Sequence, residues 1–375
     1  MSSFTAGFIG LGLIGGSIVR AMKYYYPDCR ILAFNRSRST LDYALEEGII
    51  DEALPSINEA FASCDYIFLC APVETNASCL PLLKPYIKEG MILTDVGSTK
   101  TDIHAAVEKN GLNRFFIGGH PMAGSEKTGI RNSKRILLEN AYYILTPTKE
   151  VDPALVEKYR ELVISLKALP LILSCEEHDL STAAISHLPH LIAASLVNLV
   201  KDSDSEKQTM KTIAAGGFKD ITRIASSSPE MWEQICATNR DNILIMLNRY
   251  IESLEDIRKE LTDRNKEGIH NLFAESRDYR NSISDSSQGS LPKSYSLYCD
   301  MVDEAGGIAA LATILATNGI SIKKDVYTRQ MHTFKSLYLA AMHETHGAVY
   351  QLGPGQRFSH TLISGLLVGF LQTLV

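Results

Sequence analysis

The sequence has no excess of basic residues. Its 375 residues include 37 Lys and Arg against 43 Asp and Glu, which gives a formal net charge of −6 at pH 7. This balance predicts neither a basic stripe for nucleic acid nor a polybasic patch for a membrane surface. The partner to expect is therefore a small molecule.

Paired cysteines and long apolar runs are also missing. The seven cysteines form no C-x-x-C pair and are scattered through apolar segments such as DYIFLCAPV, which indicates reduced thiols in a cytoplasmic setting and no cysteine-bound metal. No run reaches the roughly 18 to 20 apolar residues of a membrane span. An apolar strand pattern starts by residue 5, so we expect no signal peptide.

Strand and helix patterns alternate over residues 1–175. TAGFIG, RILAF, DYIFLCAP, MILTDVG and RFFIGG are predicted strands, and LIGGSIVRAMKYY, STLDYALEEG and TKTDIHAAVEKNG are among the predicted helices between them. The segments AYYILTP and LPLILS add further strands. Such alternation predicts an α/β fold with a doubly wound parallel sheet.

The remaining chain falls into three further parts. Long helical patterns with broad apolar stripes fill residues 176–281, which predicts a helical domain buried against itself or a second subunit. Serine takes six of the thirteen places in SISDSSQGSLPKS, residues 282–294, and indicates a linker. Residues 295–375 begin with a strand, loop, helix, strand pattern that is typical of a small α/β unit.

The motif GFIGLGLIGGS lies at the first strand-to-helix turn and carries the strongest functional signal. Gly10, Gly12 and Gly15 form G-x-G-x-x-G, which allows a tight turn, close approach of a pyrophosphate and close helix packing. With Leu13 and Ile14, which open the helix, they are the predicted cofactor-binding loop of a Rossmann-type domain.

The end of the second strand leaves the cofactor open between NAD and NADP. An acidic residue normally binds the adenosine ribose there, but this chain has Asn35 followed by Arg36. Asparagine can hydrogen-bond a ribose without repelling a 2′-phosphate, and nearby arginines attract one. Ordinary solvated arginines are the alternative reading.

Two loops at neighbouring strand ends supply candidate catalytic residues. TDVGSTK carries Ser98, and GGHPMAGSEKTG sets His120 between glycines and a proline. Ligands bind beyond the carboxyl ends of strands in such sheets, so both residues are predicted to face the nicotinamide. A helix N-cap is the alternative for Ser98, and a structural, hydrogen-bonded role is the alternative for His120.

Two motifs of the helical region are polar. DLSTAAISHLPHLIA carries His187 and His190, for which a zinc site would need a third ligand that is not in view, so no metal is predicted. AAGGFKDITRIASSSPEMW combines Lys219 and Arg223 at i, i+4 spacing with the single tryptophan, Trp232. A guanidinium there suits a carboxylate, which it can clamp with two hydrogen bonds.

Together, in this order and spacing, GFIGLGLIGGS, VGSTK, GGHPMAGSEKTG, SHLPHLIA and GGFKDITRIASSSPEMW resemble the prephenate dehydrogenase family over about residues 4–280. The resemblance implies oxidative decarboxylation of prephenate to 4-hydroxyphenylpyruvate, with hydride transfer to a nicotinamide cofactor, in tyrosine biosynthesis. It implies that His120 contacts the ring hydroxyl, Ser98 supports His120 and the nicotinamide, and Arg223 binds a substrate carboxylate. The other matching pocket positions are Glu126, Ser186, His190, Gly216 and Trp232, with Asp179 as a supporting partner.

Three alternatives stay open at this point. Arogenate, in which an amine replaces the side-chain ketone, is a second substrate candidate. A β-hydroxyacid dehydrogenase, with Lys219 as its catalytic lysine, shares the domain order but leaves His120 and SHLPH unexplained. A protein that binds the dinucleotide without turnover is a third reading.

The resemblance also bears on assembly and on the C-terminus. The apolar helices within 178–262 predict a homodimer. YSLYCDMVDEAGGIAALATILATNGISIK resembles the first strand, helix and second strand of an ACT domain, a small ligand-sensing module. The hairpin, helix and last strand that should follow are not recognisable in residues 324–375, whose early part is predicted to be helical. We therefore expect a partial ACT-like domain and, at most, a weak response to an amino-acid effector.

Overall fold

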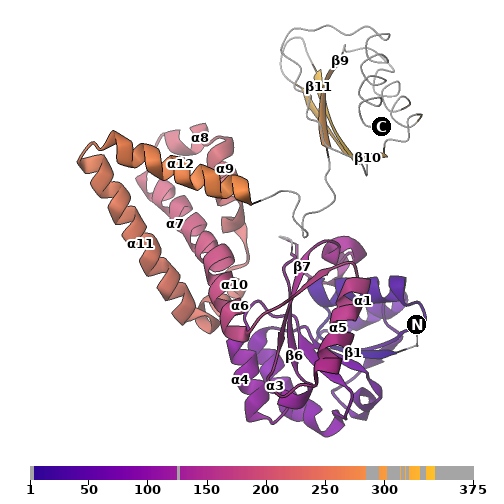
Figure 1. The fold of residues 1–375 in the computed structure, drawn as a ribbon. Coiled ribbons are helices and arrows are strands. Elements are labelled where there is room, and N and C mark those ends of the chain that lie inside the picture. Colours follow the sequence, from indigo (N-terminus) through magenta and orange to yellow (C-terminus); the bar gives the residue numbers. More distant parts are fainter. Residues whose placement is uncertain are drawn as a thin grey trace. The chain divides into compact units, whose positions relative to one another are not determined.

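The computed structural model describes residues 4–124, 127–283, 295–301, 321–329 and 335–342, with the single positions 313 and 317. The chain divides into two compact units, Met1–Gly289 and Ser290–Val375. The candidate site lies in the first unit, whose helices and strands are labelled in Figure 1.

A five-stranded parallel sheet begins the first unit, in the order β3-β2-β1-β4-β5. The order changes direction between β1 and β4, which is where doubly wound sheets bind ligands beyond the carboxyl ends of their strands. The predicted α/β class is confirmed, although the short strand β3 was not predicted. The strands are β1 (Thr5–Ile9), β2 (Arg30–Phe34), β3 (Glu52–Leu54), β4 (Tyr66–Leu69) and β5 (Ile92–Asp95), and the helices among them are α1 (Leu13–Tyr25), α2 (Arg38–Glu46), α3 (Val73–Leu83) and α4 (Thr101–Lys109).

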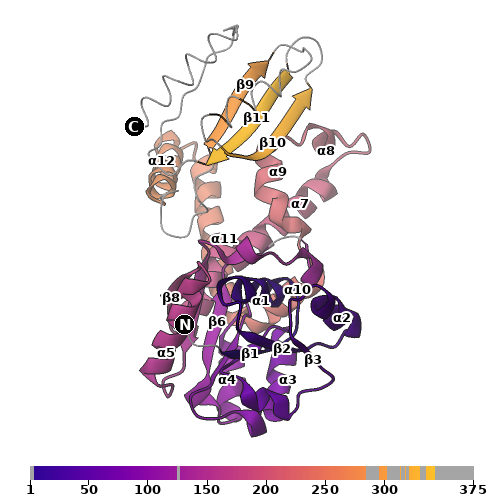
Figure 2. The same ribbon diagram turned by 90° about the vertical axis from the view of Figure 1, so that its right-hand side faces the viewer.

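Helices cover both faces of this sheet because successive side chains of a strand point to opposite faces. Phe8 of β1 and Phe68 of β4 stack at 4.8 Å between their ring centroids and share one buried cluster with residues of α1 and α2. Ile9, Leu69 and Leu80 lie in the opposite cluster, with residues of α3 and α4. Figure 2 shows α1 and α2 on one side of the strands and α3 and α4 on the other.

The next three strands depart from the all-parallel arrangement that the pattern predicted. β6 (Ile117–Pro121) lies next to β5, but β7 (Tyr142–Pro147) runs antiparallel to β6, and β8 (Leu169–Ile172) runs parallel to β7. A parallel pair needs a crossover connection, usually a helix. The described residues between β6 and β7 hold only short 3-10 turns, whereas α5 (Pro153–Ser165) connects β7 to β8.

From residue 175 to residue 282 the chain is helical, as predicted. Its exposed apolar side chains are numerous: Ile185, Leu199, Ile213, Ile221 and Leu261 are 62–71% exposed. The elements are α6 (Cys175–Thr182), a π-helical turn (Ala183–His187), α7 (Leu188–Ser203), α8 (Thr209–Ile213), α9 (Gly216–Thr222), α10 (Pro229–Thr238), α11 (Arg240–Thr262) and α12 (Lys266–Ser282).

One helical run, Cys175–Ser203, has 29 residues and contains an 18-residue window with a mean hydropathy of 1.5, so it is long and apolar enough to cross a membrane by length and composition. Its N-terminal turns are nevertheless attached to the sheet domain through polar contacts. His178 is hydrogen-bonded to His120 of β6, and Asp179 accepts from the backbone N–H of Lys100. These contacts make the run an integral part of the fold of the first unit.

The second unit contains a three-stranded antiparallel sheet in the order β10-β11-β9. Its strands are β9 (Tyr295–Met301), β10 (Ser321–Arg329) and β11 (Lys335–Met342). The helix predicted for the early part of residues 324–375 is therefore wrong, because β10 and β11 form a hairpin there. A short apolar run such as KSLYLAAM cannot be assigned to helix or strand by periodicity alone. The final apolar run lies outside the described residues.

Candidate active site

The loop between β1 and α1 has the shape that a dinucleotide phosphate requires. Gly10 has a φ of +94°, and a Cβ there would lie 2.8 Å from the backbone carbon of Cys70. A Cβ on Gly15 would lie 2.8 Å from the Gly10 carbonyl oxygen, whereas one on Gly12 would meet nothing within 4 Å. The loop therefore packs tightly against the protein at Gly10 and Gly15, whereas there is open space beside Gly12.

Helix α1 leaves its first backbone N–H groups available to a ligand. Gly12 is its N-cap, and in the described structure the helix has no side-chain cap and no acidic residue in its first turn. The first N–H groups of a helix have no intrahelical acceptor and lie at the positive end of its dipole. The amides of Leu13, Ile14 and Gly15 therefore fit an anionic pyrophosphate.

Asn35 supports this loop from the end of β2. Its Oδ1 accepts from the Leu11 N–H at 3.1 Å, and its Nδ2 donates to the Ser37 carbonyl at 3.1 Å. The side chain thus occupies the place where an acidic residue usually binds the adenosine ribose. Arg38 is in an i, i+4 ion pair, and Arg36 is the exposed cation beside Asn35.

A buried ion pair connects the ends of β5 and β6. Lys100 Nζ pairs with the Asp95 carboxylate, and both side chains are 0% exposed. Lys100 also donates to the Gly119 carbonyl at 2.8 Å, while Asp95 accepts from the Gly119 N–H at 3.2 Å. Burial lowers the pKa of Lys100, and the charge of Asp95 partly offsets this. The pair fixes the turn after β5 against the strand that carries His120.

Ser98 lies half-buried in that turn, but it is not the N-cap of α4. Lys100 holds the N-cap position, and the backbone N–H groups of Lys100 and Thr101 each donate to the carboxylate of Asp179 at 2.8 Å. The N-cap alternative for Ser98 is therefore wrong, because a carboxylate from α6 takes the donors that a capping side chain would satisfy.

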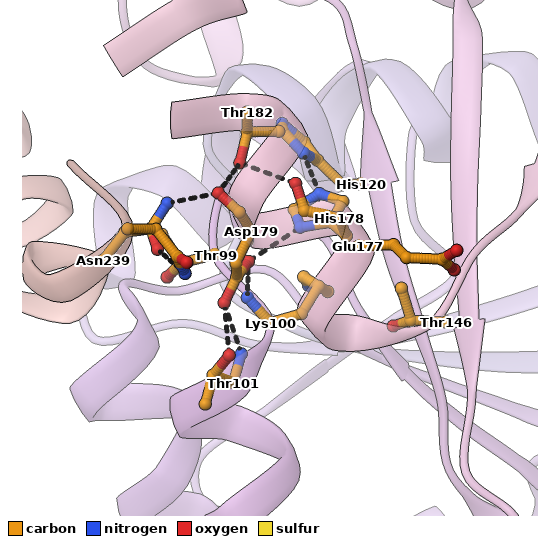
Figure 3. Close-up of polar contacts among 12 residues, drawn as sticks. Thr99, Lys100, Thr101, His120, Thr146, Glu177, His178, Asp179, Thr182 and Asn239 are labelled. Atoms are coloured by element: carbon orange, nitrogen blue, oxygen red, sulfur yellow. Dashed lines mark hydrogen bonds and ion pairs between the residues drawn. The ribbon is translucent and has the colours of Figure 1, made fainter. Parts of the chain in front are cut away.

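Three side chains, His120, His178 and Asp179, form a hydrogen-bonded chain (Figure 3). His120 Nδ1 lies 2.7 Å from His178 Nε2, and His178 Nδ1 lies 2.7 Å from Asp179 Oδ1. His178 and Asp179 are completely buried, whereas His120 is partly exposed at the end of β6. The chain joins the partly exposed imidazole to a buried carboxylate on α6.

The electrostatics of this chain favour a neutral His120 and an ionised Asp179. Burial lowers the pKa of His120 well below 6.5, and His178 and Lys100 lower it further. Burial on its own would raise the pKa of Asp179, but hydrogen bonds from His178, Thr101 and Lys100 outweigh it and lower that pKa. A neutral imidazole at this position is able to accept a proton.

The π-helical turn is connected to this chain of side chains through Asn239. Asn239 donates its Nδ2 to the Asp179 backbone carbonyl at 2.8 Å, and the same nitrogen lies 3.1 Å from His187 Nδ1. His187 is 1% exposed, and burial lowers its pKa to about 4. It is thus a buried, neutral side chain that packs, and single π-helical turns of this kind are frequent at functional sites.

A third group of predicted residues gathers around the only tryptophan of the sequence. The His190 ring stacks on Trp232 with 3.9 Å between the centroids, and His190 Nδ1 donates to the Ser186 carbonyl at 2.8 Å. Among the described residues, Trp232 Nε1 is the one buried side-chain nitrogen or oxygen without a hydrogen-bond partner. Burial lowers the pKa of His190, and the hydrogen bond to Ser186 opposes this effect. The positive charge of the exposed Arg223 lowers the same pKa further. This group therefore offers donors and a positive charge to an anionic ligand.

The structure thus places the predicted residues in three groups. The glycine loop and Asn35 form one, His120 and Asp179 the second, and Ser186, His190, Trp232 and Arg223 the third. Gly216 starts α9 and is exposed, and Glu126 lies outside the described residues.

Four polar residues of the site were not singled out from the sequence, namely His178, Asn239, Asp95 and Lys100. Asp95 and Lys100 flank Ser98 within TDVGSTK, which was a usable signal. His178 directly precedes Asp179, but its contact with His120 spans 58 positions and no local pattern indicates it. Within the described residues no cluster of three metal-ligating side chains occurs.

A glycine loop shaped for a dinucleotide phosphate on a doubly wound sheet, with a partly exposed imidazole at the end of a neighbouring strand, defines the class of dinucleotide-dependent dehydrogenases. Within that class, the nucleotide-binding domain of prephenate dehydrogenase matches residues 18–170, and the dimerization domain of prephenate dehydrogenase matches residues 174–275. The chain belongs to the prephenate dehydrogenase family.

Individual relatives agree with this assignment. The chain is 39% identical to the prephenate dehydrogenase of Bacillus subtilis over 315 residues, which cover 84% of this chain and 85% of the relative. A crystal structure of prephenate dehydrogenase from Aquifex aeolicus, in complex with hydroxyphenyl propionate and NAD+, matches with a TM-score of 0.71 at 29% identity and covers 76% of this chain and 99% of that one. Arogenate dehydrogenase from Synechocystis matches with a TM-score of 0.68 at 28% identity, over 75% and 100% of the two chains.

Proposed function

We propose that this protein oxidises prephenate with NAD+ and releases 4-hydroxyphenylpyruvate and CO2, in tyrosine biosynthesis. The single observation that carries the proposal is the partly exposed imidazole of His120, which is held neutral at the end of β6 and hydrogen-bonded to His178. Family membership supports the reaction, and the Aquifex aeolicus structure, which is a complex with NAD+, supports the cofactor.

Different residues of the chain would bind the cofactor and the substrate. NAD+, when bound, accepts the hydride from the carbinol carbon. The amides of Leu13, Ile14 and Gly15 would hold its pyrophosphate. Prephenate is a dianion, and Arg223, with the Trp232 N–H, supplies the positive and donor groups that a carboxylate requires.

His120 handles the proton of the reaction. As the hydride leaves the carbinol carbon, the hydroxyl proton passes to the imidazole and a ring carbonyl forms. The bond to the ring carboxylate then breaks, CO2 leaves, and the electron pair of that bond makes the ring aromatic. The phenolate oxygen takes the proton back, so no net proton is released. General-base assistance of this kind contributes roughly 10²- to 10⁴-fold.

Prephenate and arogenate, like NAD and NADP, differ in a single chemical group, so few protein groups decide between them. Arogenate differs from prephenate only in the amine of its side chain, and the similarity to the Synechocystis enzyme makes it the second candidate substrate. Arg36 is the exposed cation at the end of β2 that would meet a 2′-phosphate. Initial rates with both acids and with both dinucleotides decide between these candidates. If neither acid leads to formation of reduced nicotinamide, the proposal is contradicted.

Two variants separate the chemical role from the anchoring role. His120→Asn is expected to lower kcat by about 10²-fold or more and to leave the KM for NAD+ unchanged, because only an interaction of the transition state is lost. Arg223→Ala is expected to raise the KM for prephenate strongly, because a bound carboxylate loses its partner. Steady-state kinetics measure both. An unchanged kcat in the first variant, or an unchanged KM in the second, removes the corresponding assignment.

The helical region supports a homodimer. The family model that matches residues 174–275 is a dimerization domain, and exposed apolar residues such as Ile185, Ile213 and Ile221 lie within it. We expect a mass of about twice the 41.3 kDa chain at micromolar concentration, because paired helices would bury this surface. Light scattering after gel filtration measures it, and a monomer alone would contradict the dimer.

We further propose that the protein works in the cytoplasm and that its C-terminal unit is ACT-like, with at most a weak effector response. The three antiparallel strands of residues 295–342 support the ACT-like reading. Tyrosine is expected to inhibit the full chain weakly or not at all, which inhibition curves measure. Strong inhibition that disappears on truncation after residue 290 would contradict this.

A further inference from the structure

His178 is a completely buried, hydrogen-bonded imidazole that the proposed reaction does not use directly. It lies on α6, and its two ring nitrogens contact two different partners at 2.7 Å each, His120 Nδ1 and Asp179 Oδ1. The His120 and His178 rings meet edge to face, with 5.0 Å between their centroids. A buried polar side chain with both nitrogens engaged holds a defined orientation.

The direction of these hydrogen bonds follows from Asp179. Its Oδ1 accepts from the backbone N–H of Lys100, and its Oδ2 accepts from the backbone N–H of Thr101 at 2.8 Å and from the Thr101 hydroxyl at 2.6 Å. A backbone N–H only donates, and these donors lower the pKa of Asp179 and keep it ionised, so both of its oxygens are acceptors. His178 must therefore carry its proton on Nδ1 and donate it to Asp179.

The tautomer of His178 in turn determines the tautomer of His120. A neutral imidazole with its proton on Nδ1 has a lone pair on Nε2, which accepts hydrogen bonds. His120 Nδ1 faces that lone pair and must carry the proton between the two rings. The tautomer that remains for His120 has a free lone pair on Nε2, the nitrogen turned away from His178.

We propose that His178 is a positioning residue, which transmits the orientation of the Asp179 carboxylate to His120 and thereby makes His120 Nε2 the proton acceptor of the reaction. This inference rests on the proposed function of the site. In the opposite tautomer Nε2 would carry a hydrogen and could not accept the substrate proton, and such a wrong tautomer severely impairs a catalytic histidine. Because His178 and Asp179 belong to α6, the base is competent only when this helix is docked on α4.

Two variants of His178 provide a matched test. In asparagine the side-chain amide lies near the position of Nδ1 of histidine, so His178→Asn keeps a donor for Asp179 but removes the acceptor for His120. In glutamine the amide lies near the position of Nε2, so His178→Gln keeps an acceptor for His120. We expect His178→Asn to lower kcat by about 10- to 100-fold, with both KM values changed by less than about twofold, and His178→Gln to recover a large part of the loss.

Each kinetic outcome decides the question. Lower kcat in His178→Asn with recovery in His178→Gln supports the positioning role. Wild-type kcat in His178→Asn overturns it, and so does an equal loss in both variants with raised KM values, because a merely structural residue would produce that pattern.

A spectroscopic measurement separates this inference from the proposed function and does not depend on how the His178 variants fold. Nitrogen NMR of the full chain labelled with ¹⁵N-histidine reports which ring nitrogen carries the hydrogen, and the His120→Asn spectrum identifies the His120 signals. We expect the ring hydrogen of His120 and that of His178 to be on Nδ1. A His120 protonated at Nε2 overturns the positioning role even if prephenate is turned over, whereas a failure to oxidise prephenate would remove the proposed function and leave this result standing.

Discussion

The carboxylate of Asp179 is the interaction on which the rest of the site depends. It lies in the interior of the first unit, where an ion without partners is strongly disfavoured. Donors on Lys100, Thr101 and His178 satisfy its lone pairs, and these donors come from two different parts of the fold. The carboxylate thus caps α4, attaches α6 to the sheet domain and orients His178 at the same time.

This arrangement explains how two structural layers cooperate in one site. The sheet domain supplies the open glycine loop, and the Asp95–Lys100 ion pair holds the strand end that carries His120. The helical region supplies His178 and Asp179 and, further along the chain, the His190–Trp232 stack. The proton acceptor, His120, lies on β6, but its tautomer is determined by His178 and Asp179 of α6.

The sequence was sufficient for the parts of the fold that local patterns determine. Gly10, Gly12 and Gly15 could be placed because a strand, a tight turn and a helix follow one another directly in the sequence. The helical character of residues 176–281 was equally clear from its apolar spacing.

Features that depend on distant contacts were out of reach. The antiparallel course of β7 depends on the turns that precede it, and β11 is too short for its period to be recognised. A helix N-cap was the alternative for Ser98 because serine often caps helices, but Asp179, about 80 positions away, satisfies those amides. His178 was overlooked for the same reason, because its role exists only once α6 lies against β6.

The pH dependence of kcat/KM for prephenate tests the central claim most directly, because this ratio reports the ionisation of the free enzyme. Activity requires neutral His120, whose pKa is held well below 6.5 by burial, by His178, Lys100 and His187, and against the opposing charge of Asp179. We therefore expect kcat/KM to stay constant as the pH falls through 6.5 and to decline only at lower pH, as His120 becomes protonated. An acid limb with an apparent pKa at or above 6.5, absent from the residual activity of His120→Asn, would contradict the account.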